Sequence, residues 1–531
     1  MPSDCIPFRD TNYFSSLICD YLDQKAELKP FYNRFPKVEN FEAQILEKQQ
    51  SFSNENRKIL VNALNSQYRS TNYSETTKKN IESLAQTSTF TVTTGHQLNL
   101  FTGPLYFLYK IVSTINLTRE LKEKYPNYNF VPIYWMATED HDFDEINYFN
   151  LFGKKIQWNR KDGGAVGVFD TNGLDKVFDI FSSEIGSGRN AERLKSLFKE
   201  TYLKHNNLAE ATRYLANELF ADYGLVIIDG DDRELKRLFI PFVEKELVEQ
   251  TSYNTVLPKA QKLKDTGYKI QVNPRAINLF YLADGLRERI IEEDGSYFVN
   301  ETEISWSKSE IVKELYEFPE RFSPNVMMRP LYQEVILPNL CYIGGGGELA
   351  YWFELKDYFD AVQIPFPMLL LRNSVLIQTN KQAEKIKKLN VSDTELFLKQ
   401  HELINHKVRR ISNIDINFDP QRAHLREQFE EMYKLAEQTD VTFGNAVKAQ
   451  EVKQLKGLDV LEKRLLKAQK RKLSDHVQRL TTIQNELFPN QSLQERTINF
   501  SEMYLEYGEE LIPTLIKHLD PLKGEFLIVS S

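Results

Sequence analysis

The chain has 531 residues, of which 41% are hydrophobic and 27% are charged, and its formal net charge is -8. This length allows a large core and predicts two to four structural units. The negative charge argues against a general nucleic-acid-binding protein, whose affinity comes from a basic face that neutralises phosphates. It leaves room for a local basic pocket that binds one small anion.

The three cysteines, Cys5, Cys19 and Cys341, match no metal or redox motif. They predict neither a disulfide framework nor a zinc site. The N-terminus has no basic region followed by an apolar run, and no apolar stretch reaches the roughly 18 residues of a membrane span. We therefore expect a cytoplasmic protein that binds neither a membrane nor nucleic acid.

Residues from about 10 to 85 have the pattern of helices, and from Phe90 onward short apolar runs alternate with helical patterns. The expected strands are residues 90–94, 130–135, 224–229, 339–343 and 367–371. Helical spacing follows the first strand over 105–115 and the third over 234–249. This alternation predicts a parallel sheet covered on both faces. The fold class is therefore α/β, with a Rossmann-like, doubly wound parallel sheet at the core.

Two segments interrupt this pattern and are interpreted as inserted connecting segments, at about 147–220 and 250–325. The first begins with short strands and a turn at Gly163-Gly164, and the second contains a small meander over 277–298. Together with the helical N-terminal region, these insertions place the core domain at residues 1–372.

Residues 373–490 are predicted to form an α-helical coiled-coil domain. Leu466, Leu473, Leu480 and Leu487 recur every seven residues on a charged background, which indicates an antiparallel helical hairpin or coiled coil. A projecting arm that pairs two subunits would have this pattern, and so would a helical subdomain packed on its own core. The C-terminal segment, 491–531, is expected to return to the core.

Polar residues and glycines gather where the first strand passes into a helix. Ligands of parallel sheets bind beyond the carboxyl ends of the strands, and a helix N-terminus favours an anion. His96 could donate to a phosphate or to a developing negative charge, although a structural histidine is the alternative. The residues expected to bind substrate or nucleotide here are Thr94, Gly95, Gln97, Asn99, Thr102, Gly103 and Lys110.

Glu139, Asp140, His141 and Asp142 follow the second strand. These charges would repel one another unless a cation, an amine or water satisfied them. Alternate residues of an extended loop face opposite ways, so we expect either Glu139 with His141 or Asp140 with Asp142 to meet one ligand. Such a pair could hold Mg²⁺, bind a substrate ammonium group or deprotonate an attacking amine. The alternative is helix capping by Asp142 and Asp144.

The run Gly344-Gly345-Gly346-Gly347-Glu348 lies at a third junction between a strand and a helix. Four glycines are entropically costly for a simple turn, so they predict a backbone nest for phosphate or carboxylate. The run matches neither the P-loop nor the dinucleotide-binding fingerprint. Arg329 would add a fixed cation at the same end of the sheet, and a structural ion pair is an equally compatible role for it.

Taken together, these junctions resemble the bacillithiol biosynthesis cysteine-adding enzymes, the BshC family. The similar runs are 94–110, 135–143, 329–331, 347–352 and 487–496, in the family's order over nearly the whole chain. The resemblance implies a ligase that forms a carbon–nitrogen (amide) bond between cysteine and the amine of glucosaminyl-malate. It also implies a Rossmann-like core, inserted connecting segments and a homodimer formed through the coiled coil.

Amide formation requires an activated carboxylate, so we expect ATP as co-substrate and a cysteinyl adenylate as intermediate, with Mg²⁺ as a further candidate ligand. His96 would stabilise phosphate charge, Asp140 or a neighbouring carboxylate would position the sugar amine or Mg²⁺, and His141 would act as base. The glycine run and Arg329 would hold a phosphate or the malate carboxylate.

The core is also similar to nucleotidyl-transferring enzymes related to class I aminoacyl-tRNA synthetases. Only Gly95-His96 answers to their His-x-Gly-His motif, and neither a Lys-Met-Ser-Lys-Ser motif nor a zinc-binding cysteine cluster is present. Two other hypotheses stay open. One is a nucleotide-binding transferase of the same fold with another acceptor, and the other is a non-enzymatic nucleotide-binding scaffold.

Overall fold

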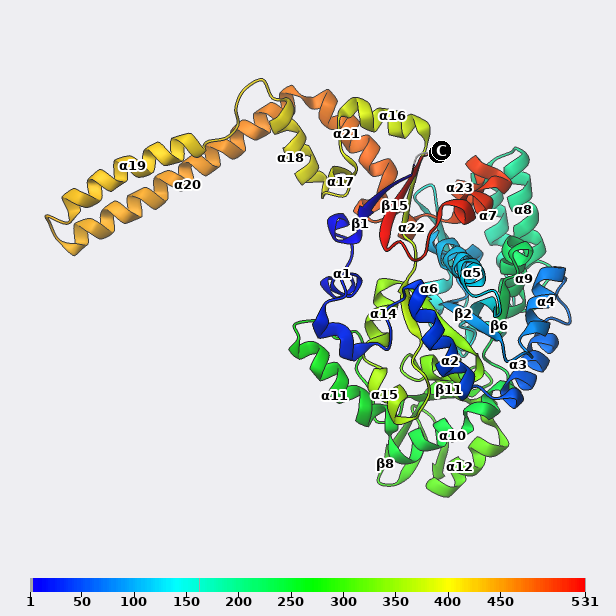
Figure 1. Ribbon diagram of the computed structural model, residues 1–531. Coiled ribbons are helices and arrows are strands. Elements are labelled where there is room, and N and C mark those ends of the chain that lie inside the picture. Colours follow the sequence, from blue (N-terminus) through cyan, green and yellow to red (C-terminus); the bar gives the residue numbers. More distant parts are fainter. Residues whose placement is uncertain (1–2, 162, 531) are drawn as a thin grey trace. The chain divides into compact units, whose positions relative to one another are not determined.

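The computed structural model describes residues 3–161 and 163–530, which divide into two compact units (Figure 1). Among these described residues, unit 1 comprises those of 3–376 and 493–529, and unit 2 comprises 377–492 with residue 530. Within the described ranges, no helix combines the length and the apolar character needed to cross a membrane.

A five-stranded parallel sheet forms the centre of unit 1 (Figure 1). Its order is β13-β12-β2-β3-β6, and each neighbouring pair is parallel. The chain builds outward from β2 to β3 and β6 on one side and from β12 to β13 on the other, which creates a topological switch point between β2 and β12. The predicted Rossmann-like sheet is confirmed. The strands are β2 (Thr89–His96), β3 (Asn129–Met136), β6 (Val226–Asp229), β12 (Asn339–Gly344) and β13 (Met368–Leu371).

Helices cover this sheet and bury its apolar side chains. Phe90 and Val92 of β2 share one core cluster with Leu117 and Leu121 of α5, and burial of each such side chain stabilises the fold by roughly 1.5–3 kcal/mol. Helix α5 packs along β2 and β3, and α2 lies against β12. The core helices are α1 (Ser16–Leu22), α2 (Phe41–Ser51), α3 (Asn54–Gln67), α4 (Glu75–Ser83), α5 (Tyr106–Lys124), α10 (Arg233–Glu249), α13 (Arg329–Ile336), α14 (Gly346–Trp352) and α15 (Lys356–Ala361).

The first insertion differs from the prediction in the position of its turn. Its hairpin closes at Phe152 and Gly153, which both have positive φ as a tight two-residue turn requires. Gly163 and Gly164 instead lie against the backbone of Gly285, where a Cβ atom would come within about 3.1 Å. The elements are α6 (Phe143–Ile146), β4 (Tyr148–Leu151), β5 (Lys154–Gln157), α7 (Leu174–Ile185), α8 (Arg189–Tyr202) and α9 (Leu208–Phe220).

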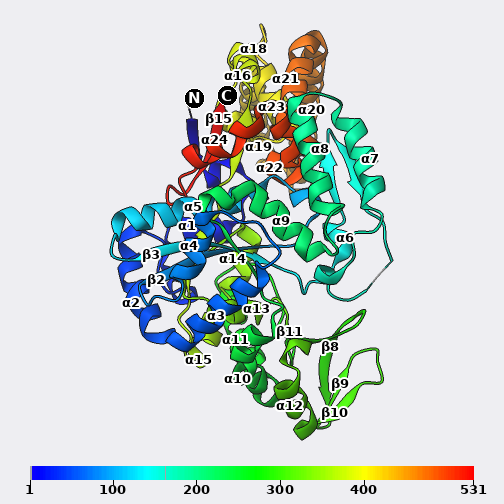
Figure 2. The same ribbon diagram turned by 90° about the vertical axis from the view of Figure 1, so that its right-hand side faces the viewer.

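The second insertion contains the expected meander as part of a larger antiparallel sheet. In Figure 2 this sheet lies away from α7 and α8 of the first insertion. Its strand order is β10-β9-β8-β7-β11, with glycine turns at Gly285 and Gly295 that have positive φ. The elements are α11 (Thr251–Asp265), β7 (Leu279–Ala283), β8 (Leu286–Glu293), β9 (Ser296–Val299), β10 (Ser305–Ser307), α12 (Lys308–Glu317) and β11 (Phe322–Pro324).

The C-terminal residues of unit 1 pack on its first strand and on α5. Strand β15 pairs antiparallel with β1, and Asn116 Nδ2 of α5 donates to the carbonyls of Ile516 and Leu519 at 2.9 and 2.6 Å. These elements are β1 (Ser3–Pro7), α22 (Gln494–Thr497), α23 (Phe500–Tyr507), α24 (Leu511–His518) and β15 (Glu525–Ser530).

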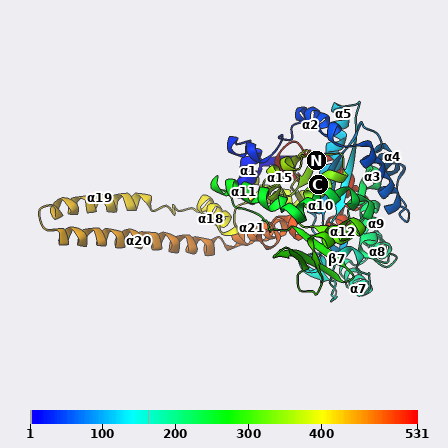
Figure 3. The same ribbon diagram turned by 90° about the horizontal axis from the view of Figure 1, so that it is seen from below.

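Unit 2 is helical and contains an antiparallel hairpin of α19 and α20, which lie side by side in Figure 3. Its elements are α16 (Asn380–Leu389), α17 (Asp393–Leu396), α18 (Gln400–Ile411), α19 (Asp419–Ala436), α20 (Val441–Lys472) and α21 (Ser474–Leu487). Strand β14 (Val375–Gln378) crosses the boundary between the units.

The leucine heptads do not form the seam of this hairpin. Leu473 leaves the helical conformation, so the run divides between α20 and α21. Leu466 packs with Val408 of α18 and Ile416, and Leu480 is buried in α21. The hairpin is instead closed by another apolar cluster, made of Phe429, Ala436 and Val447.

Candidate functional site

A cavity of about 790 Å³ lies in unit 1 at the carboxyl ends of β2, β3 and β12. This is the switch point of the sheet, where the fold predicts a ligand site. The structure therefore brings together most residues that the three sequence motifs single out. Those lining the cavity are Gly95, His96, Gln97, Lys110, Glu139, Asp140, His141, Arg329, Gly345, Gly346, Gly347 and Glu348.

Lys110 connects the first and third junctions. Its Nζ donates to the Gly95 carbonyl at 2.7 Å and lies 2.6 Å from Glu348 Oε2. Glu348 also accepts from Tyr342 Oη at 2.6 Å and from the Gly345 N–H at 2.8 Å. Burial raises the pKa of Glu348, but the Lys110 charge and these hydrogen bonds outweigh it and lower the pKa to about 2. Glu348 is therefore an ionised brace that caps the turn at Gly345.

His96 ends β2 and is 7% exposed. Its ring lies against Tyr106 and Phe107, with centroid distances of 5.6 and 5.1 Å. Burial, together with the charge of Lys110, lowers its pKa to about 3. His96 is therefore neutral near pH 7 and can offer an N–H donor to a ligand but no positive charge. Its Nε2 atom is buried without a hydrogen-bond partner in the described part of the chain.

Glu139 is held by a buried lysine. Lys236 Nζ of α10 lies 2.6 Å from Glu139 Oε1 and 3.0 Å from Asp231 Oδ1, and it also donates to the Glu320 carbonyl at 2.8 Å. Although burial lowers the pKa of Lys236, the two carboxylates raise it above its usual value. This pairing leaves Glu139 less available as a base than the sequence suggests.

Asp140 and His141 lie near each other and contact residues from other segments of the chain. Asp140 Oδ2 accepts from Gln97 Nε2 at 2.8 Å, and Asp140 Oδ1 accepts from the His141 backbone N–H at 2.8 Å. His141 Nδ1 lies 2.5 Å from Arg287 Nη1 and 3.7 Å from Asp140 Oδ1. The structure thus joins Asp140, His141 and Arg287, and Glu139 and His141, one of the two expected pairs, both line the cavity.

Asp142 is the member of this motif that lies outside the cavity. It is exposed, and its side chain forms no capping hydrogen bond to α6 among the described residues. In the same ranges, no three His, Cys, Asp or Glu side chains are arranged so that they could hold a metal ion.

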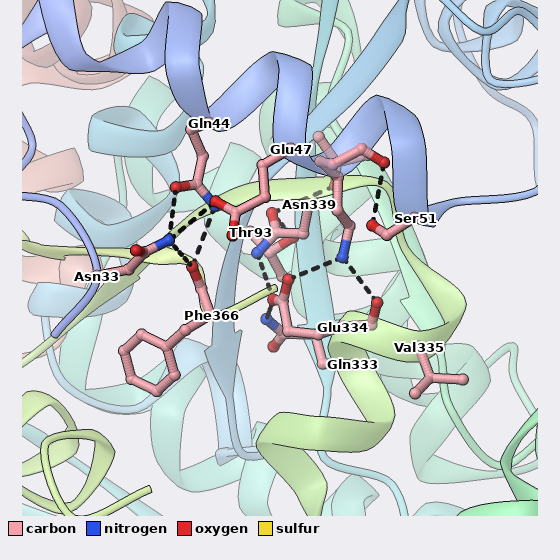
Figure 4. Close-up of polar contacts among 12 residues, drawn as sticks. Asn33, Gln44, Glu47, Ser51, Thr93, Gln333, Glu334, Val335, Asn339 and Phe366 are labelled. Carbon is pink, nitrogen blue, oxygen red and sulfur yellow. Dashed lines mark hydrogen bonds and ion pairs between the residues drawn. The ribbon is translucent and has the colours of Figure 1, made fainter. Parts of the chain in front are cut away.

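Arg329 begins α13 and is positioned by a buried polar network. Its Nη1 donates to Gln333 Oε1 at 3.0 Å, and Gln333 Nε2 donates to Glu334 Oε1 at 3.0 Å. Lys48 Nζ of α2 lies 3.2 Å from Glu334 Oε2, and both side chains are buried. Figure 4 shows Gln333, Glu334 and Asn339 within this network.

The guanidinium group of Arg329 has its Nη1 atom in this network and also interacts with Tyr351. Its Nη2 atom is buried without a partner in the described ranges. The group also lies 5.8 Å from the Trp135 ring and 5.6 Å from the Tyr342 ring. A fixed cation with one unused donor is suited to an anionic ligand in the cavity.

Most of the cations that line the cavity were not predicted from the sequence. Arg372 follows β13 directly. Its position at the end of a fifth predicted strand could therefore have identified it as a residue of the site. Arg372 Nη2 lies 2.7 Å from the fully buried Glu495 Oε1 of α22. The other missed cations come from the second insertion and from α22, where no local pattern marked them. They are Arg275, Arg287, Arg289 and Arg496.

The charge balance of the cavity is positive. Lys110 and six arginines line it, against the carboxylates of Glu139, Asp140, Glu145 and Glu348. Two of these carboxylates are already paired with lysines. A concave surface of one predominant sign concentrates ligands of the opposite sign. The site is therefore suited to a polyanion such as a nucleotide or a dicarboxylate.

The remaining predicted residues lie elsewhere. Thr94 Oγ1 donates to the Ile343 carbonyl at 2.8 Å and ties β2 to β12. Thr102 is buried, and Gly344 belongs to β12; neither of these two residues, nor Thr94, lines the main cavity. Asn99 and Gly103 line a second cavity of about 280 Å³ instead.

Comparison with known proteins gives matches over the whole chain. Residues 1–373 match the family model "Bacillithiol biosynthesis BshC, N-terminal Rossmann-like domain", and residues 375–531 match "Bacillithiol biosynthesis BshC, C-terminal coiled-coil domain". Three relatives described as "Putative cysteine ligase BshC" are similar in length. The protein of Christiangramia forsetii is 64% identical over 100% of this chain and 99% of its own. Those of Flavobacterium johnsoniae and Cytophaga hutchinsonii are 62% and 39% identical, over 100% and 97% of this chain and 100% and 96% of their own.

Proposed function

Because the chain belongs to the BshC family of bacillithiol biosynthesis, we propose that it is a ligase that joins cysteine to the amine of glucosaminyl-malate through an amide bond. The observation that carries this proposal is the basic cavity at the strand ends of the Rossmann-like core. Its cations suit the malate carboxylates and a nucleotide. The small-molecule substrates and a thiol product agree with a reaction in the cytoplasm.

The free carboxylate of cysteine must be activated before an amine can displace an oxygen from it. In the proposed reaction, a cysteine carboxylate oxygen attacks the α-phosphorus of ATP and pyrophosphate leaves. The sugar amine, after losing its proton, then attacks the acyl carbon of the adenylate. The amide bond forms, and AMP leaves with the former carboxylate oxygen.

The residues of the cavity have distinct roles in this scheme. Asp140 reaches the cavity, so its carboxylate would accept the proton of the sugar ammonium group, and His141, whose Nδ1 faces Arg287, would help to orient that carboxylate. Neutral His96 would donate an N–H to phosphate oxygen. Arg329, with its unpaired Nη2, would hold a phosphate or the malate carboxylate. Gly345 to Gly347 allow close approach of that anion to the backbone.

The test is turnover by the purified full-length protein with ATP, cysteine and glucosaminyl-malate, read by mass spectrometry of the amide and by chromatography of AMP and ADP. We expect the amide and AMP in equal amounts. Arg329→Gln should reduce kcat/KM by about tenfold or more, since it loses a charged hydrogen bond. The matched control is Arg237→Gln, an exposed arginine of α10, which should retain wild-type activity.

Other outcomes separate the alternatives. Nucleotide turnover that does not depend on cysteine would favour a transferase with another acceptor. Nucleotide binding without turnover would favour a scaffold. Full product formation by the double variant His96→Ala, Asp140→Ala would contradict the assigned roles, and ADP in place of AMP would replace the adenylate by an acyl phosphate.

We also propose that two chains form a homodimer through the hairpin of α19 and α20. Apolar side chains of these helices remain solvent-exposed, among them Leu435 at 59% and Val460 at 49%. A second copy of the hairpin could cover them in an antiparallel or parallel helical pairing.

A further inference from the structure

The smaller cavity of about 280 Å³ adjoins the main cavity within unit 1. Four residues line both cavities and so form the boundary between them: Gln97, Tyr106, Glu145 and Arg496. Its volume is below the range typical of sites for drug-sized ligands, about 300–1,000 Å³. The smaller cavity is therefore suited to one small molecule that reaches into the main cavity.

A strained loop forms one wall of this smaller cavity. Phe101, Thr102 and Gly103 have φ values of 47, 69 and 63° in succession. Such a conformation is unfavourable for an aromatic and a β-branched residue, and it persists only where surrounding contacts enforce it. Strain of this kind is concentrated at binding and catalytic sites.

The surrounding contacts that enforce this conformation are specific. Asn499 Nδ2 donates to the carbonyls of Phe101 and Gly103, both at 2.7 Å, and Asn499 is fully buried. The Phe101 N–H donates to Tyr202 Oη at 2.7 Å. The loop is therefore held from two sides, by the C-terminal segment and by α8.

The loop conformation places Asn99 in the wall of the smaller cavity. Gly103 lies so close to Asn99 that a Cβ atom at position 103 would come within 2.6 Å of Asn99 Cβ. Asn99 is 9% exposed, and its Nδ2 donates to the Glu145 carbonyl at 3.2 Å. Its Oδ1 is buried without a hydrogen-bond partner among residues 3–161 and 163–530. A buried acceptor without a donor is unfavourable, so a ligand that supplies an N–H is stabilised there.

Two charged side chains at the boundary complete the recognition pattern. The Glu145 carboxylate accepts from Gln97 Nε2 at 2.9 Å and retains further acceptor capacity. Arg496 forms no ion pair in the described ranges. A carboxylate and an unpaired guanidinium group in one small cavity complement a zwitterion.

We propose that the smaller cavity is the subsite for the amino-acid substrate, a small zwitterionic α-amino acid that the proposed function identifies as cysteine. The ammonium group donates to Asn99 Oδ1 and faces the Glu145 carboxylate. The carboxylate of the amino acid faces Arg496 at the boundary. This orientation directs the carbon to be activated toward the main cavity, where the nucleotide and the sugar amine bind. The inference rests on the proposed function for the identity of the amino acid.

Each variant is tested with an analogue of cysteine that lacks the group bound by the substituted residue. Cysteamine has no carboxylate, and 3-mercaptopropionate has no ammonium group; both are measured as inhibitors against cysteine in the full-length protein. We expect Arg496→Met to raise the KM for cysteine about tenfold or more and to leave the Ki of cysteamine within about twofold. Asn99→Ala should raise the KM for cysteine and the Ki of cysteamine, and leave the Ki of 3-mercaptopropionate unchanged.

Controls separate this inference from general damage. Arg496→Lys, which keeps the charge, should recover part of the affinity, and Arg237→Met should behave as wild type. The KM values for ATP and glucosaminyl-malate should stay within about twofold in Arg496→Met and Asn99→Ala. Circular dichroism and thermal unfolding confirm that each variant is folded.

Two results would overturn the inference. One is a rise in the KM for glucosaminyl-malate, rather than for cysteine, in Arg496→Met. The other is an equal effect of each variant on both analogues. Calorimetric titration of the wild type and these variants with cysteine alone tests the subsite without turnover. If cysteine binds as described but no amide forms, the proposed function fails and the subsite stands; if the amide forms and the variants leave cysteine binding unchanged, the subsite fails alone.

Discussion

Glu139 and Glu348 illustrate how a partner decides the role of a carboxylate. Each lies 2.6 Å from a buried lysine, Lys236 for Glu139 and Lys110 for Glu348. Asp140, in contrast, accepts from an amide side chain and from the backbone N–H of His141. A carboxylate already neutralised by a lysine gains little from a second cation. Asp140 is therefore the carboxylate of the second motif best placed to meet a substrate amine.

The charge state of His96 gives a prediction for stability against pH. The pKa of His96 is about 3 in the folded protein, whereas the ordinary value for histidine is 6.5. Between pH 3 and pH 6.5, His96 is therefore protonated in the unfolded chain and neutral in the folded protein. The stability that neutral His96 contributes is complete above pH 6.5 and is lost as the pH falls toward 3. Between pH 7.5 and 5.5, the free energy of unfolding of the wild type should fall by about 1.4 kcal/mol more than that of His96→Gln.

Urea denaturation of the wild type and of His96→Gln, each at pH 7.5 and at pH 5.5, measures this difference. Each protein serves as its own reference, so any uniform destabilisation by the substitution cancels. An equal loss of stability in both would mean that His96 is protonated in the folded protein at pH 5.5.

At the scale of elements, α13 joins the buried interior to the cavity. Its first residue, Arg329, reaches the ligand site, while Glu334 lies near the other end of the helix and pairs with Lys48 of α2. Gln333 connects the two by hydrogen bonds. The position of a site cation therefore depends on an ion pair between two helices of the core, part of which is seen in Figure 4.

Loss of this ion pair should destabilise unit 1 strongly. Lys48→Met leaves Glu334 buried without its cation, and we expect the free energy of unfolding to fall by about 3–5 kcal/mol. The neutral pair Lys48→Met, Glu334→Gln should recover most of this loss, because glutamine still accepts from Asn339 without a buried charge. Chemical denaturation of the three proteins measures both effects.

The exposed lysine of the neighbouring helix, Lys58, supplies the control, and Lys58→Met should change stability by less than about 0.5 kcal/mol. If the single variant at Lys48 is as stable as the wild type, the pair does not stabilise the fold. If the neutral pair is no better than the single variant, packing rather than charge explains the loss.

At the scale of the whole molecule, the chain combines a sheet-based unit that carries the site with a helical unit. Unit 2 has its own apolar clusters, and Arg422 of α19 lies 2.8 Å from Asp459 of α20. These contacts hold the hairpin together within one chain. Its remaining exposed apolar side chains are those that the proposed dimer would cover.

Charged substitutions on the hairpin should dissociate the dimer. We expect Leu435→Glu, Val460→Glu to halve the molecular mass measured by light scattering after size exclusion, because two carboxylates would be buried in the pairing without partners. Helix content in circular dichroism should stay unchanged. The matched control adds the same charge at exposed polar positions of α20, Gln450→Glu and Gln454→Glu, and should stay dimeric. A wild type of monomer mass, or a variant that keeps dimer mass, would contradict the proposed pairing.

The sequence by itself determined the local elements and the location of the site. Short apolar runs alternating with helical spacing identified the strands of the parallel sheet, because backbone hydrogen bonding imposes these periods within a few residues. Polar residues directly after β2, β3 and β12 then marked the cavity, since parallel strands all end at one edge. The hairpin at residues 152–153 and the helix break at Leu473 were missed because their signals were weaker than the nearby glycine pair and leucine heptad.

Only the tertiary structure decided which polar groups meet. Lys236 lies 97 residues from Glu139, and Glu495 lies 123 residues from Arg372. Arg287 and Arg496 reach the cavity from an insertion and from the C-terminal segment. Contacts of this kind depend on how distant elements pack, and no local period encodes them. The pairing of each carboxylate, the neutral state of His96 and the smaller cavity beside Asn99 therefore follow from the fold rather than from the motifs.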